Sequence, residues 1–500
     1  MGKQQKKKGT TMSLSEFANQ RSGYDVVDTP AVASEPTAAA AMPAADTSKI
    51  KRSAMPAAAS DLTAAAALDV IIVGAGAAGV GCALMLTRTF GLETSRVLLI
   101  ERGETVGDTF RRWPAEMRFI TPSFNQQGWT TSFDLNSVAY GTSPAYSLHA
   151  EHPSGDEYAD YLNALTRENR LRVRTMTEVV SVQAGAKRFS VGVRDTPFVV
   201  SQKDKRCATE VLDARYVVWA AGEFQYPAVN SLAGAEHCLH NSRVRSWARL
   251  SGDDFVVIGG YESGADAAFN LAKAGKRTTV LASTASWDVQ TADPSTELAP
   301  YTAGRLREVT AASFSPQPKL LAPLRVLRVE KVQAGGFNVI AAWKAAQDLP
   351  PPGPLRKPLT IHTKSGAPVG PEGSELVVHT AQPPVLCTGF EGSVAAAARH
   401  LFKLADESDE AKGCLAGAPM LTLDDESTIV PGVFLVGPTV RHGELSFCFI
   451  YKFRQRFGVV ADAICRGLGR DTKEAVEICR MQNMYLDDFK CCKTECGEAC

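Results

Sequence analysis

Four cysteines lie close together near the end of the sequence, and their thiols are the first groups whose spacing suggests chemistry. The segment KCCKTECGEAC spans residues 490–500 and contains Cys491, Cys492, Cys496 and Cys500. Adjacent cysteines form a strained and easily reduced disulfide, so Cys491 and Cys492 are candidate catalytic thiols. The four thiolates are weak candidates for a Zn²⁺ site or a site for a softer metal ion, and a reduced tail without a role is the third interpretation.

A glycine motif with the spacing of a dinucleotide-binding loop lies near the start of the apolar part of the chain. In DVIIVGAGAAGVGCALML, Gly74, Gly76 and Gly79 follow a β-branched run and open an alanine-rich run. In such a loop the first glycine makes the turn, the second lets the backbone approach a pyrophosphate, and the third lets the helix pack on the strand. The next apolar run, RVLLIER, ends in Glu101, whose carboxylate can accept hydrogen bonds from both ribose hydroxyls of an adenosine. We assign the adjacent Arg102 to the same site.

The same pattern returns in DDFVVIGGYESGADAAFNLAKAGKRTTVL. Its middle glycine is replaced by Tyr261, a side chain that should either push a pyrophosphate away or stack over it. The following run ends in VLAS, without an acid for a free ribose or an arginine for a 2′-phosphate. Charge from elsewhere would then come from Lys276, Arg277 or Arg305. The residues predicted to bind a nicotinamide dinucleotide are Gly259, Gly260, Ser263 and Gly264.

Both glycine loops require parallel strands that alternate with helices. Short β-branched runs do alternate with alanine-rich stretches from Leu68 onward, which predicts an α/β protein with two Rossmann-like, three-layer ββα dinucleotide-binding domains. A long helix is expected from about Glu444 to the glycines at Gly467 and Gly469. The predicted strands are Val70–Val73, Val97–Ile100, Tyr216–Ala220, Phe255–Ile258 and Thr278–Leu281.

The order of these motifs predicts how the domains divide the chain. Residues 1–67 are rich in Ala, Pro, Ser and Thr and are expected to be disordered, and the Pro/Gly-rich stretch 348–358 is expected to be a surface loop. We predict a first part of one domain at 68–228, a second domain at 229–382, the second part of the first domain at 383–470, and a cysteine-rich tail at 471–500.

The overall composition argues against partners that recognise a strong charge. Lys and Arg together number 54, as do Asp and Glu, so no net field draws the chain to nucleic acid or to an anionic membrane. Outside the tail the cysteines are scattered singly, which favours a reducing, cytoplasmic location over a disulfide-rich secreted one. The N-terminal residues lack the apolar core of a signal peptide, and the glycine spacing predicts a strand and a helix, not a transmembrane segment, over residues 70–86.

Further stretches add a family resemblance. From about Asp69 to Gly469 the sequence resembles flavoproteins with two dinucleotide-binding domains, a superfamily that includes flavin-containing monooxygenases, Baeyer-Villiger monooxygenases and thioredoxin reductases. It is similar to uncharacterised bacterial FAD/NAD(P)-binding oxidoreductases that carry the same FRRWPxEMRFITPSF, GGYESG and CFIYKFRQRF phrases. The stretches that carry the likeness are ERGETVGDTFRRW, YVVWAAGEFQYP, PPVLCTGF and PGVFLVGPTVRHGELSFCFIYKFRQRF.

The resemblance implies FAD as the bound cofactor and NAD(P)H as its reductant, with the flavin carrying the chemistry and the protein positioning it. It implies a loop near the flavin, two strand-to-glycine junctions where the chain crosses between domains, and a glycine near the ribityl chain. The loop near the flavin contains Gly107, Thr109, Phe110 and Trp113. The junctions contain Gly222 and Gly389, and the glycine near the ribityl chain is Gly437.

The destination of the electrons separates the possible reactions. A monooxygenase of this superfamily carries an F-x-G-x-x-x-H-x-x-x-W/Y signature, and SLAGAEHCLHNSRVRSW, with Gly234, His240 and Trp247, departs from that spacing. A disulfide reductase needs paired thiols beside the flavin, and neither C-x-x-C nor C-x4-C occurs in the body of the chain. Cys387 and Cys448 are expected to be buried apolar residues.

These observations predict an FAD-dependent, NAD(P)H-using oxidoreductase of the flavin-containing monooxygenase-like group. Hydride would pass from NAD(P)H to FAD and the electrons then to O₂ and a small organic substrate. One alternative is a thiol/disulfide or metal(loid) reductase that uses the C-terminal cysteines. The other is a flavoprotein redox sensor or binding protein in which Tyr261 blocks hydride transfer. The expected partner is a small-molecule substrate, and a homodimer is a possible assembly.

Overall fold

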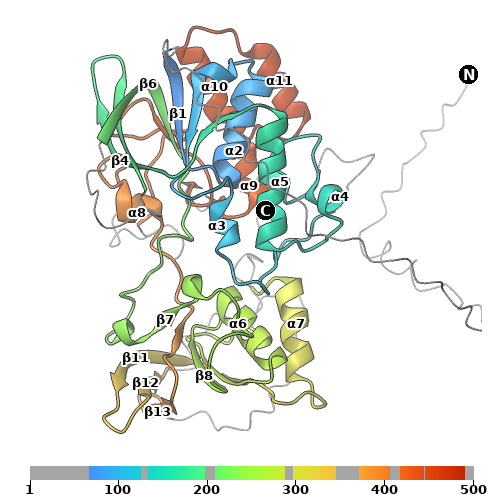
Figure 1. The fold of residues 1–500 in the computed structure, drawn as a ribbon, viewed down its shortest axis with the longest axis vertical. Helices are drawn as coiled ribbons and strands as arrows, with labels where there is room; N and C mark the ends of the chain where they lie inside the picture. The colour runs from blue at the N-terminus through green and yellow to red at the C-terminus, as the bar shows by residue number, and fades with distance from the viewer. Residues whose placement is uncertain are drawn as a thin grey trace, which may run out of the picture. The chain divides into compact units, whose positions relative to one another are not determined.

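The computed structural model describes residues 67–124, 133–196, 209–287, 297–344, 371–405, 417–443 and 445–489. Outside these ranges lie residues 1–66 of the N-terminal segment predicted to be disordered, the predicted surface loop at 348–358, and residues 490–500 of the predicted cysteine-rich tail at 471–500. The chain divides into two units, residues 1–62 and residues 63–500, and the fold below is that of the larger unit. Its helices and strands form two lobes, which are labelled by element in Figure 1.

The first lobe is built on a seven-stranded sheet whose central strand is β1, Leu68–Val73. Strand β1 runs parallel to β2, Val97–Ile100, and to the second half of β6, Thr209–Trp219. The first half of β6 instead pairs antiparallel with β5, Phe189–Asp195, which pairs in turn with β4, Thr177–Ala184. Strand β6 therefore joins the parallel sheet to an antiparallel meander. Strand β3, Arg172–Arg174, completes the parallel edge beside β2.

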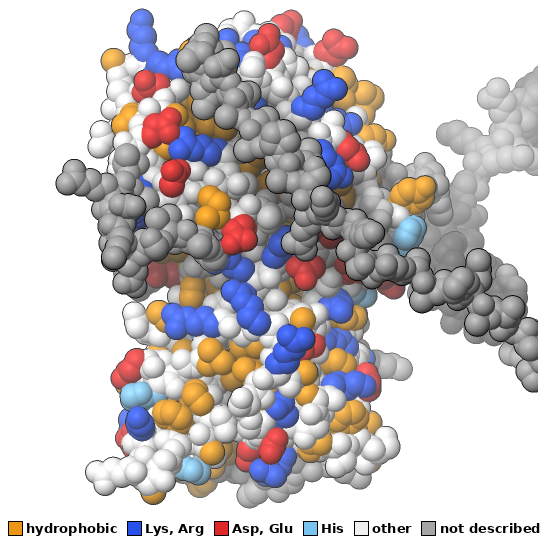
Figure 2. Space-filling view, in the orientation of Figure 1, with side chains coloured by type: hydrophobic (Ala, Val, Ile, Leu, Met, Phe, Trp, Pro, Cys, Tyr) orange, Lys and Arg blue, Asp and Glu red, His pale blue; other side chains and the backbone are white. Residues whose placement is uncertain are grey.

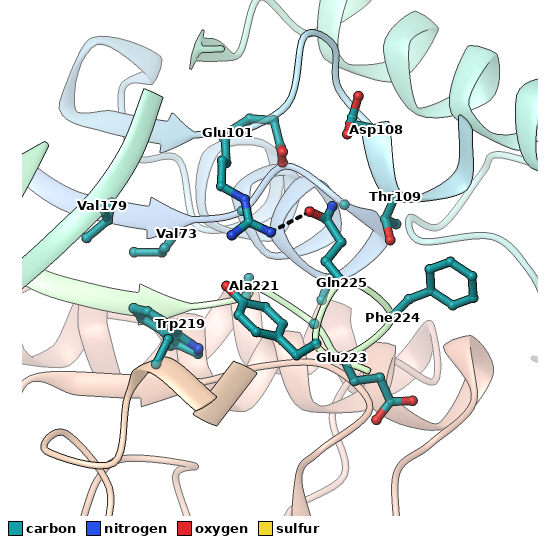
Figure 3. A pocket seen from close by; sticks show the side chains of 18 of the residues that line it. Val73, Glu101, Asp108, Thr109, Val179, Trp219, Ala221, Glu223, Phe224 and Gln225 are labelled. Atoms are coloured by element: carbon teal, nitrogen blue, oxygen red, sulfur yellow. Dashed lines mark hydrogen bonds between the residues drawn. The ribbon is translucent and has the colours of Figure 1, made fainter. Parts of the chain in front are cut away.

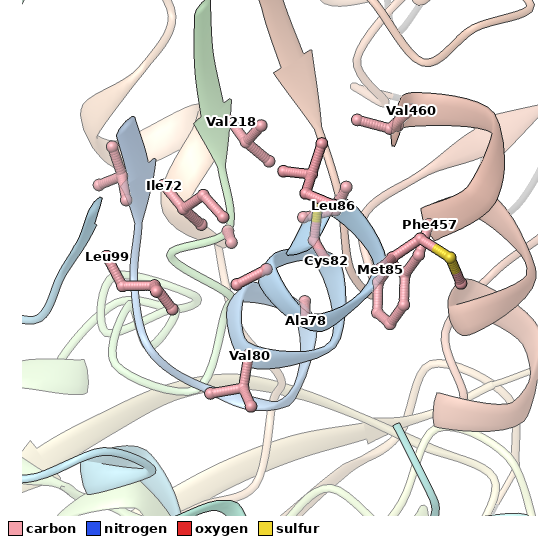
Figure 4. Packing of buried hydrophobic residues seen from close by; sticks show 14 of the residues in the cluster. Ile72, Ala78, Val80, Cys82, Met85, Leu86, Leu99, Val218, Phe457 and Val460 are labelled. Atoms are coloured by element: carbon pink, nitrogen blue, oxygen red, sulfur yellow. The ribbon is translucent and has the colours of Figure 1, made fainter. Parts of the chain in front are cut away.

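Helix α2, Ala77–Leu84, packs its small side chains against this sheet and continues as a π-helical segment, Met85–Thr89. Figure 4 shows Ala78, Cys82 and Leu86 on this helical stretch among strand residues such as Ile72 and Val218. Gly81 is needed on the side that faces the C-terminal helix, because a Cβ atom there would lie 2.2 Å from the ring of Phe457. Alanine and glycine thus allow two helices and a sheet to meet closely.

The C-terminal part of the chain completes the first lobe. Strand β15, Val433–Leu435, lies parallel to β6, and α10, Phe457–Gly467, packs on α2. Figure 4 shows Phe457 and Val460 of α10 turned toward the α2 core. Helix α5, Gly155–Glu168, covers another side of α2 and begins with a capping box formed by Ser154 and Glu157. This lobe also contains the shorter helices α3 at Asp108–Arg111, α4 at Pro144–Leu148, α8 at Ser393–Ala397 and α11 at Lys473–Met481.

The second lobe has a smaller parallel sheet, with helices packed on one face and an antiparallel sheet packed on the other. Its strand order is β10-β9-β8-β14-β7, and one face carries α6, Glu262–Lys273, and α7, Pro300–Thr310. The other face carries an antiparallel sheet of three strands. The parallel strands are β7 Leu239–His240, β8 Asp254–Ile258, β9 Arg277–Leu281, β10 Lys319–Leu321 and β14 Val385–Leu386, and the antiparallel strands are β11 Leu324–Lys331, β12 Phe337–Trp343 and β13 Glu375–Thr380.

The predicted fold class is confirmed: both lobes have the three-layer α/β architecture, and the five predicted strands coincide with β1, β2, β6, β8 and β9. The predicted end of the second domain at residue 382 differs from the structure, because β14 adds Val385 and Leu386 to the sheet of the second lobe. The two predicted crossing points lie side by side, since Pro227 and Phe390 form an antiparallel bridge.

The long helix predicted from about Glu444 begins later than expected. Residues 445–446 form strand β17, which pairs with β16, Arg441–His442, and Glu444 itself is outside the described residues. The helical region starts at Ile450 with α9, Ile450–Phe453. A short 3-10 segment, Arg454–Arg456, then leads into α10. Long-range contacts, such as that of His442 with the buried carboxylate of Asp425, hold the preceding chain extended. The predicted end at Gly467 is confirmed.

Within the described residues no helix is long and apolar enough to cross a membrane. The stretch 70–86 is divided between β1 and α2, as its glycines predict. Figure 2 shows Lys/Arg and Asp/Glu side chains on both lobes, in keeping with the equal numbers of the two charges in the sequence.

Candidate dinucleotide-binding sites

A cavity of about 650 Å³ opens at the carboxyl ends of β1, β2 and β6 in the first lobe. This is the edge of a parallel sheet at which ligands usually bind, because the strand-to-helix loops meet there. Figure 3 shows Glu101, Gln225 and Trp219 around this space. The cavity is lined by eight of the residues that sequence analysis assigned to the first nucleotide, namely Gly74, Gly76, Glu101, Arg102, Thr109, Phe110, Trp113 and Gly222.

The three glycines of the first loop have three different surroundings. A Cβ atom on Gly74, which has φ +104°, would lie 2.6 Å from the carbonyl oxygen of Ala220, and one on Gly79 would lie 2.0 Å from the carbonyl oxygen of Gly74. A Cβ atom on Gly76 would have no atom within 4 Å. The first and third glycines are therefore required by the fold itself, whereas the second leaves open space on the cavity wall.

Glu101 stands at the end of β2, with its carboxylate held by backbone donors. Ala75 N donates to Oε2 and Gly103 N donates to Oε1, both at 2.8 Å. The side chain is 6 % exposed, and its burial raises the pKa of the carboxyl group, while these two hydrogen bonds act in the opposite direction. The carboxylate is thus fixed beside the glycine loop.

Next to it, Arg102 forms one wall of the cavity. Its Nη2 donates to Oε1 of Gln225 at 2.6 Å, and its guanidinium lies 5.4 Å from the ring centre of Tyr226. Figure 3 shows the hydrogen bond to Gln225. The residues Val179–Val182 of β4 line the same region. A planar cation, an aromatic ring and an apolar strand thus surround this end of the cavity, a composition suited to a heteroaromatic ring such as adenine.

The loop after β2 supplies an aromatic cluster. Gly107, with φ +73°, is the N-cap of α3 and lies against Ala159 of α5, so it supports the loop without lining the cavity. Phe110 packs on Trp113 with ring centres 5.2 Å apart and on Tyr158 at 4.9 Å. The indole N–H of Trp113 is shielded from solvent and has no hydrogen-bond acceptor among the described residues. It is a donor that a bound molecule could use.

The far end of the cavity contains groups that sequence analysis did not assign. Glu223 lines it beside Pro438, and burial raises the pKa of this carboxyl group despite the opposing charge of Arg441. Cys448 also lines the cavity and is exposed, so the prediction that it is a buried apolar residue is wrong. The reason is the late start of the final helix, which leaves Cys448 in the extended chain before α9. Cys387 is buried as predicted, and burial raises the pKa of its thiol.

Two glycines assigned to FAD by resemblance do not line the cavity. Gly437, with φ +112°, follows β15, and a Cβ atom on it would lie 3.2 Å from that of Ala78 at the start of α2. Gly389 lies in the crossing chain, where its carbonyl oxygen accepts a hydrogen bond from Ala228 N and lies 3.0 Å from Nε2 of His240. Gly437 is therefore next to the site through Pro438, whereas the structure places Gly389 outside the cavity wall.

The loop of the second lobe repeats the first at two of its three glycine positions. A Cβ atom on Gly264 would lie 2.0 Å from the carbonyl oxygen of Gly259, the same distance as between Gly79 and Gly74. Gly259 has φ +107°, and Gly260 faces Ala282 at 2.4 Å from its would-be Cβ atom. Ser263 lies in the first turn of α6, between the N-cap, Tyr261, and Gly264. The four residues predicted to bind NAD(P) therefore lie together at the end of β8.

The cations proposed to assist this loop are engaged elsewhere. Lys276 donates to the carbonyl oxygens of Leu250 and Gly252, and Arg277 begins β9 at the end of the sheet opposite the loop. Arg305 forms an ion pair of 2.7 Å with Asp266, which is 7 % exposed. The expectation that these side chains hold a 2′-phosphate at the loop is therefore not supported for Lys276 or Arg277, and the Arg305 charge is already paired.

His240 has a structural role in this lobe. It is 2 % exposed, its Nδ1 lies 3.0 Å from the hydroxyl of Ser242, and burial lowers the pKa of the imidazole. Trp247 is fully buried, and its Nε1 donates to Asp266. Gly234 is fixed by a close approach to Val329, whose carbonyl oxygen lies 1.9 Å from its would-be Cβ atom. None of these three faces the cavity of the first lobe, although all belong to the segment compared with the monooxygenase signature.

Sequence reasoning missed several lining residues. Gln225 and Tyr226 belong to the AAGEFQYP phrase, so their position directly after a strand was an available signal. The β4 residues carry no such signal, because the meander brings them to the cavity. The candidate metal ligands and thiols Cys491, Cys492, Cys496 and Cys500 lie outside the described residues, and among the described residues no group of three or more His, Cys, Asp or Glu side chains has metal-binding geometry.

Curated relatives match less than half of the chain. An uncharacterised oxidoreductase, CzcO, from Bacillus velezensis is 26% identical over 221 residues, which are 43% of this chain and 54% of that protein. The CzcO of Bacillus subtilis is 25% identical over 222 residues, with the same coverage. The chain thus spans about half the length of the curated relatives it matches.

Solved structures share the fold over a longer range. The bacillithiol disulfide reductase Bdr (YpdA) of Bacillus cereus is 18% identical with a TM-score of 0.55, covering 80% of this chain and 100% of that chain. The ornithine N-hydroxylase of Kutzneria sp. 744 is 16% identical with a TM-score of 0.55, covering 81% and 100%. Proteins with different reactions therefore have this fold, so the fold alone does not identify the reaction.

A family model places the chain more directly. The model described as pyridine nucleotide-disulphide oxidoreductase matches residues 71–335, just over half of the 500 residues. The match begins in β1 and includes both glycine loops. The chain belongs to the pyridine nucleotide-disulphide oxidoreductase family.

Proposed function

We propose that the chain binds FAD in the first-lobe cavity and is an NAD(P)H-using oxidoreductase. The observation that carries this proposal is the combination of open space at Gly76 with the fixed carboxylate of Glu101 at the neighbouring strand end. Backbone at Gly76 would face the pyrophosphate, and Glu101 would accept hydrogen bonds from the adenosine ribose. Gly76 and Glu101 follow the ends of two paired strands, β1 and β2, so the sheet fixes the spacing between them.

The other walls suit the remaining parts of the cofactor. The Arg102 and Tyr226 end offers stacking for the adenine ring, and the aromatic cluster of Phe110 and Trp113 offers the same for the flavin ring. Trp113 Nε1 has a proton to donate and no acceptor among the described residues. The ornithine N-hydroxylase was solved with reduced FAD and NADP⁺, so the shared fold can accommodate both cofactors.

When bound, FAD would supply hydride acceptance from NAD(P)H and electron transfer to O₂ and a small organic substrate, as in a flavin-containing monooxygenase. The chain would contribute by orienting the cofactor and excluding water. Glu223 would hold a proton inside the cavity more readily than an exposed carboxyl group does, because burial raises its pKa. We propose Gly259, Gly260, Ser263 and Gly264 as the binding loop for the nicotinamide dinucleotide.

The test begins with the purified full-length chain. We expect a flavin absorption spectrum, FAD as the molecule released on denaturation, and loss of the flavin absorbance when NADPH or NADH is added without oxygen. A chain that purifies without flavin and does not take up added FAD would contradict the cofactor assignment. A flavin that neither nucleotide bleaches would contradict the enzyme assignment and favour a redox sensor or binding protein.

Cys448 supports a second candidate function, reduction of disulfides. Among the described free cysteines, Cys448 is the exposed one, and it lines the cavity next to Phe224 and Ile450. The aromatic ring of its neighbour Phe447 packs on Phe489, 6.1 Å away between ring centres, just before the cysteine tail. The thiolate of Cys448 or of a tail cysteine would displace one thiol of a disulfide substrate and form a mixed disulfide with the other half. The two electrons of NAD(P)H, with protons from solvent, would then reduce that bond, releasing the second thiol and restoring the cysteine.

Matched substitutions separate this candidate from the monooxygenase. We expect a disulfide reductase to convert a model disulfide with NADPH and to lose this activity in Cys448→Ser or in Cys491→Ser/Cys492→Ser, while Cys465→Ser, at a buried position in α10, keeps it. NADPH consumption that depends on O₂ and a small organic substrate, and is unchanged in these variants, would instead favour the monooxygenase.

A further inference from the structure

The second glycine loop has the backbone of a nucleotide-binding loop but is covered by its own side chains. Tyr261 and Gly76 occupy equivalent N-cap positions and share one conformation, with φ −87° and ψ −161° for Tyr261 and φ −81° and ψ −167° for Gly76. This is extended backbone that any residue adopts, so tyrosine causes no strain there. The difference between the loops therefore lies in what occupies the space beside this residue.

The side chain of Tyr261 is tied to the segment that leads into α7. Its hydroxyl donates to the carbonyl oxygen of Glu297 at 2.8 Å. The side chain is 42 % exposed, so the phenol ring lies on the outer side of the loop and not in the core. At the corresponding place in the first lobe Gly76 has open space, which is where a pyrophosphate would approach the backbone.

Glu262 makes the second connection to the same segment. Its Oε1 accepts a hydrogen bond from Ala299 N and its Oε2 accepts one from the hydroxyl of Thr302, both at 2.5 Å. The carboxylate belongs to the first turn of α6, where negative charge interacts favourably with the helix dipole. A pyrophosphate at this helix end would therefore compete with a carboxylate that is already in place.

We propose that Tyr261 and Glu262 latch residues 297–302 over the nicotinamide loop, and that a pyrophosphate-containing dinucleotide binds there only by displacing Tyr261. This inference rests on the proposed function for the identity of the loop. It makes Tyr261 the residue that sets the affinity for the nucleotide. The three hydrogen bonds to residues 297–302 oppose binding, so weakening the latch should strengthen it.

Direct binding measurements test the latch without turnover. The probes are NAD⁺ and NADP⁺, titrated by calorimetry into the FAD-loaded full-length chain. We expect Tyr261→Gly to bind at least one of them about 10-fold or more tightly than the wild type, because it removes the ring and restores the open space found at Gly76. Tyr261→Phe, which keeps the ring but removes the hydroxyl that donates to Glu297, should give a smaller gain of about 3-fold.

A second pair of variants keeps the test decisive if Tyr261→Gly does not fold. Thr302→Val removes the hydroxyl that donates to Glu262 and should also tighten binding, by about 3-fold. Thr310→Val is the matched control, because this hydroxyl belongs to the same helix but donates to the carbonyl oxygen of Leu306. It should leave nucleotide affinity unchanged. Melting temperature and flavin content verify that each variant is folded.

Two results would overturn the latch. One is a wild-type affinity equal to that of the Tyr261 and Thr302 variants, and the other is the absence of nucleotide binding in every folded variant. The latch and the proposed function fail separately. If NAD(P)H bleaches the flavin of Tyr261→Gly but not of the wild type, the latch is supported while the wild-type enzyme assignment fails. If NAD(P)H bleaches the flavin of the wild type, and the wild type binds the nucleotide as tightly as its variants do, the enzyme assignment is supported and the latch fails.

Discussion

The two glycine loops of this chain have nearly the same backbone and different surroundings. Their first glycines have φ +104° and +107°, and their third glycines would each place a Cβ atom 2.0 Å from a carbonyl oxygen. At the middle position the first loop has Gly76 beside a cavity, whereas the second has Tyr261 tied to Glu297. The first turn of α2 contains no acidic residue, whereas that of α6 begins with Glu262.

The comparison separates two requirements that the G-x-G-x-x-G motif combines, one for folding and one for binding. The turn and the close packing of helix on strand are conditions of the fold, and both loops satisfy them. Access of a phosphate to the backbone is a condition of binding, and only the first loop leaves it open. A glycine motif therefore indicates a Rossmann-like fold more firmly than it indicates an occupied site.

The largest expected effect tests the shared requirement. Gly79→Ala and Gly264→Ala should each destabilise their lobe by about 3 kcal/mol or more, because each Cβ atom would overlap a backbone carbonyl that cannot move away. The measurement is the free energy of unfolding in urea, followed separately by flavin release and by tryptophan fluorescence. A large loss for one glycine and none for the other would break the structural equivalence of the loops.

The next effect tests the difference between them. Gly76→Ala should lower FAD affinity by about 100-fold, which corresponds to ~2.7 kcal/mol, while the stability of the apoprotein stays unchanged. The new methyl group meets no protein atom within 4 Å, so it interferes only with a molecule in the cavity. FAD titration of the apoprotein measures this.

Gly304→Ala is the matched control for that substitution. Gly304 also has no atom within 4 Å of a would-be Cβ atom, but it lies inside α7, away from the first-lobe cavity. Alanine should stabilise the helix slightly, by up to about 1 kcal/mol, and leave FAD binding unchanged. Equal FAD affinities for Gly76→Ala and Gly304→Ala would contradict the proposal that FAD binds beside Gly76.

The smallest effect concerns the acidic residue that only the second loop carries. Burial raises the pKa of Glu262 to about 6 from its ordinary value of 4.5, with Asp266 adding to the rise and Arg305 opposing it. A carboxyl group whose pKa is raised in the folded state stabilises the fold relatively more at low pH, and this contribution is lost as the pH rises through the folded value.

Replacing Glu262 should therefore change the pH dependence of stability. At pH 8, Glu262→Gln should be more stable than the wild type by about 1 kcal/mol, after allowance for the partial exposure of the side chain. The difference should disappear below pH ~4.5, where both side chains are neutral. Chemical denaturation at several pH values measures this, and a constant difference from pH 4 to pH 8 would contradict it.

The sequence is most informative where local spacing determines structure. Strand, loop and helix patterns predict a role for Gly74, Gly76 and Glu101, and the structure places them around one cavity. Resemblance predicts Phe110 and Trp113, which lie on its wall. Gly74, Gly76 and Glu101 lie within three residues of the strands that position them, and Phe110 and Trp113 lie in the loop and short helix after β2, so a local pattern is enough to locate them.

Features set by contacts between distant segments are beyond sequence reasoning. The β4 wall depends on the pairing of β4 with β5, and Cys448 is exposed in the extended chain that precedes the late start of the last helix. The resemblance assigns Gly389 to the FAD site as a strand-to-glycine junction, but the strand before it, β14, belongs to the sheet of the second lobe. Neither burial nor strand pairing of this kind is encoded in a local pattern.

The pairing of β15 with β6 has a consequence for synthesis of the chain. On the ribosome, α2 emerges about 380 residues and β6 about 250 residues before α10 is complete, and the shorter delay is roughly 12 to 50 s at ~5–20 residues per second. The second lobe has all its strands only once residue 386 has emerged, and at that point the first lobe still lacks β15 and α10, which complete its core. The domain begun first is therefore finished last, and its incompletely covered apolar core is prone to aggregation until the C-terminal segment arrives.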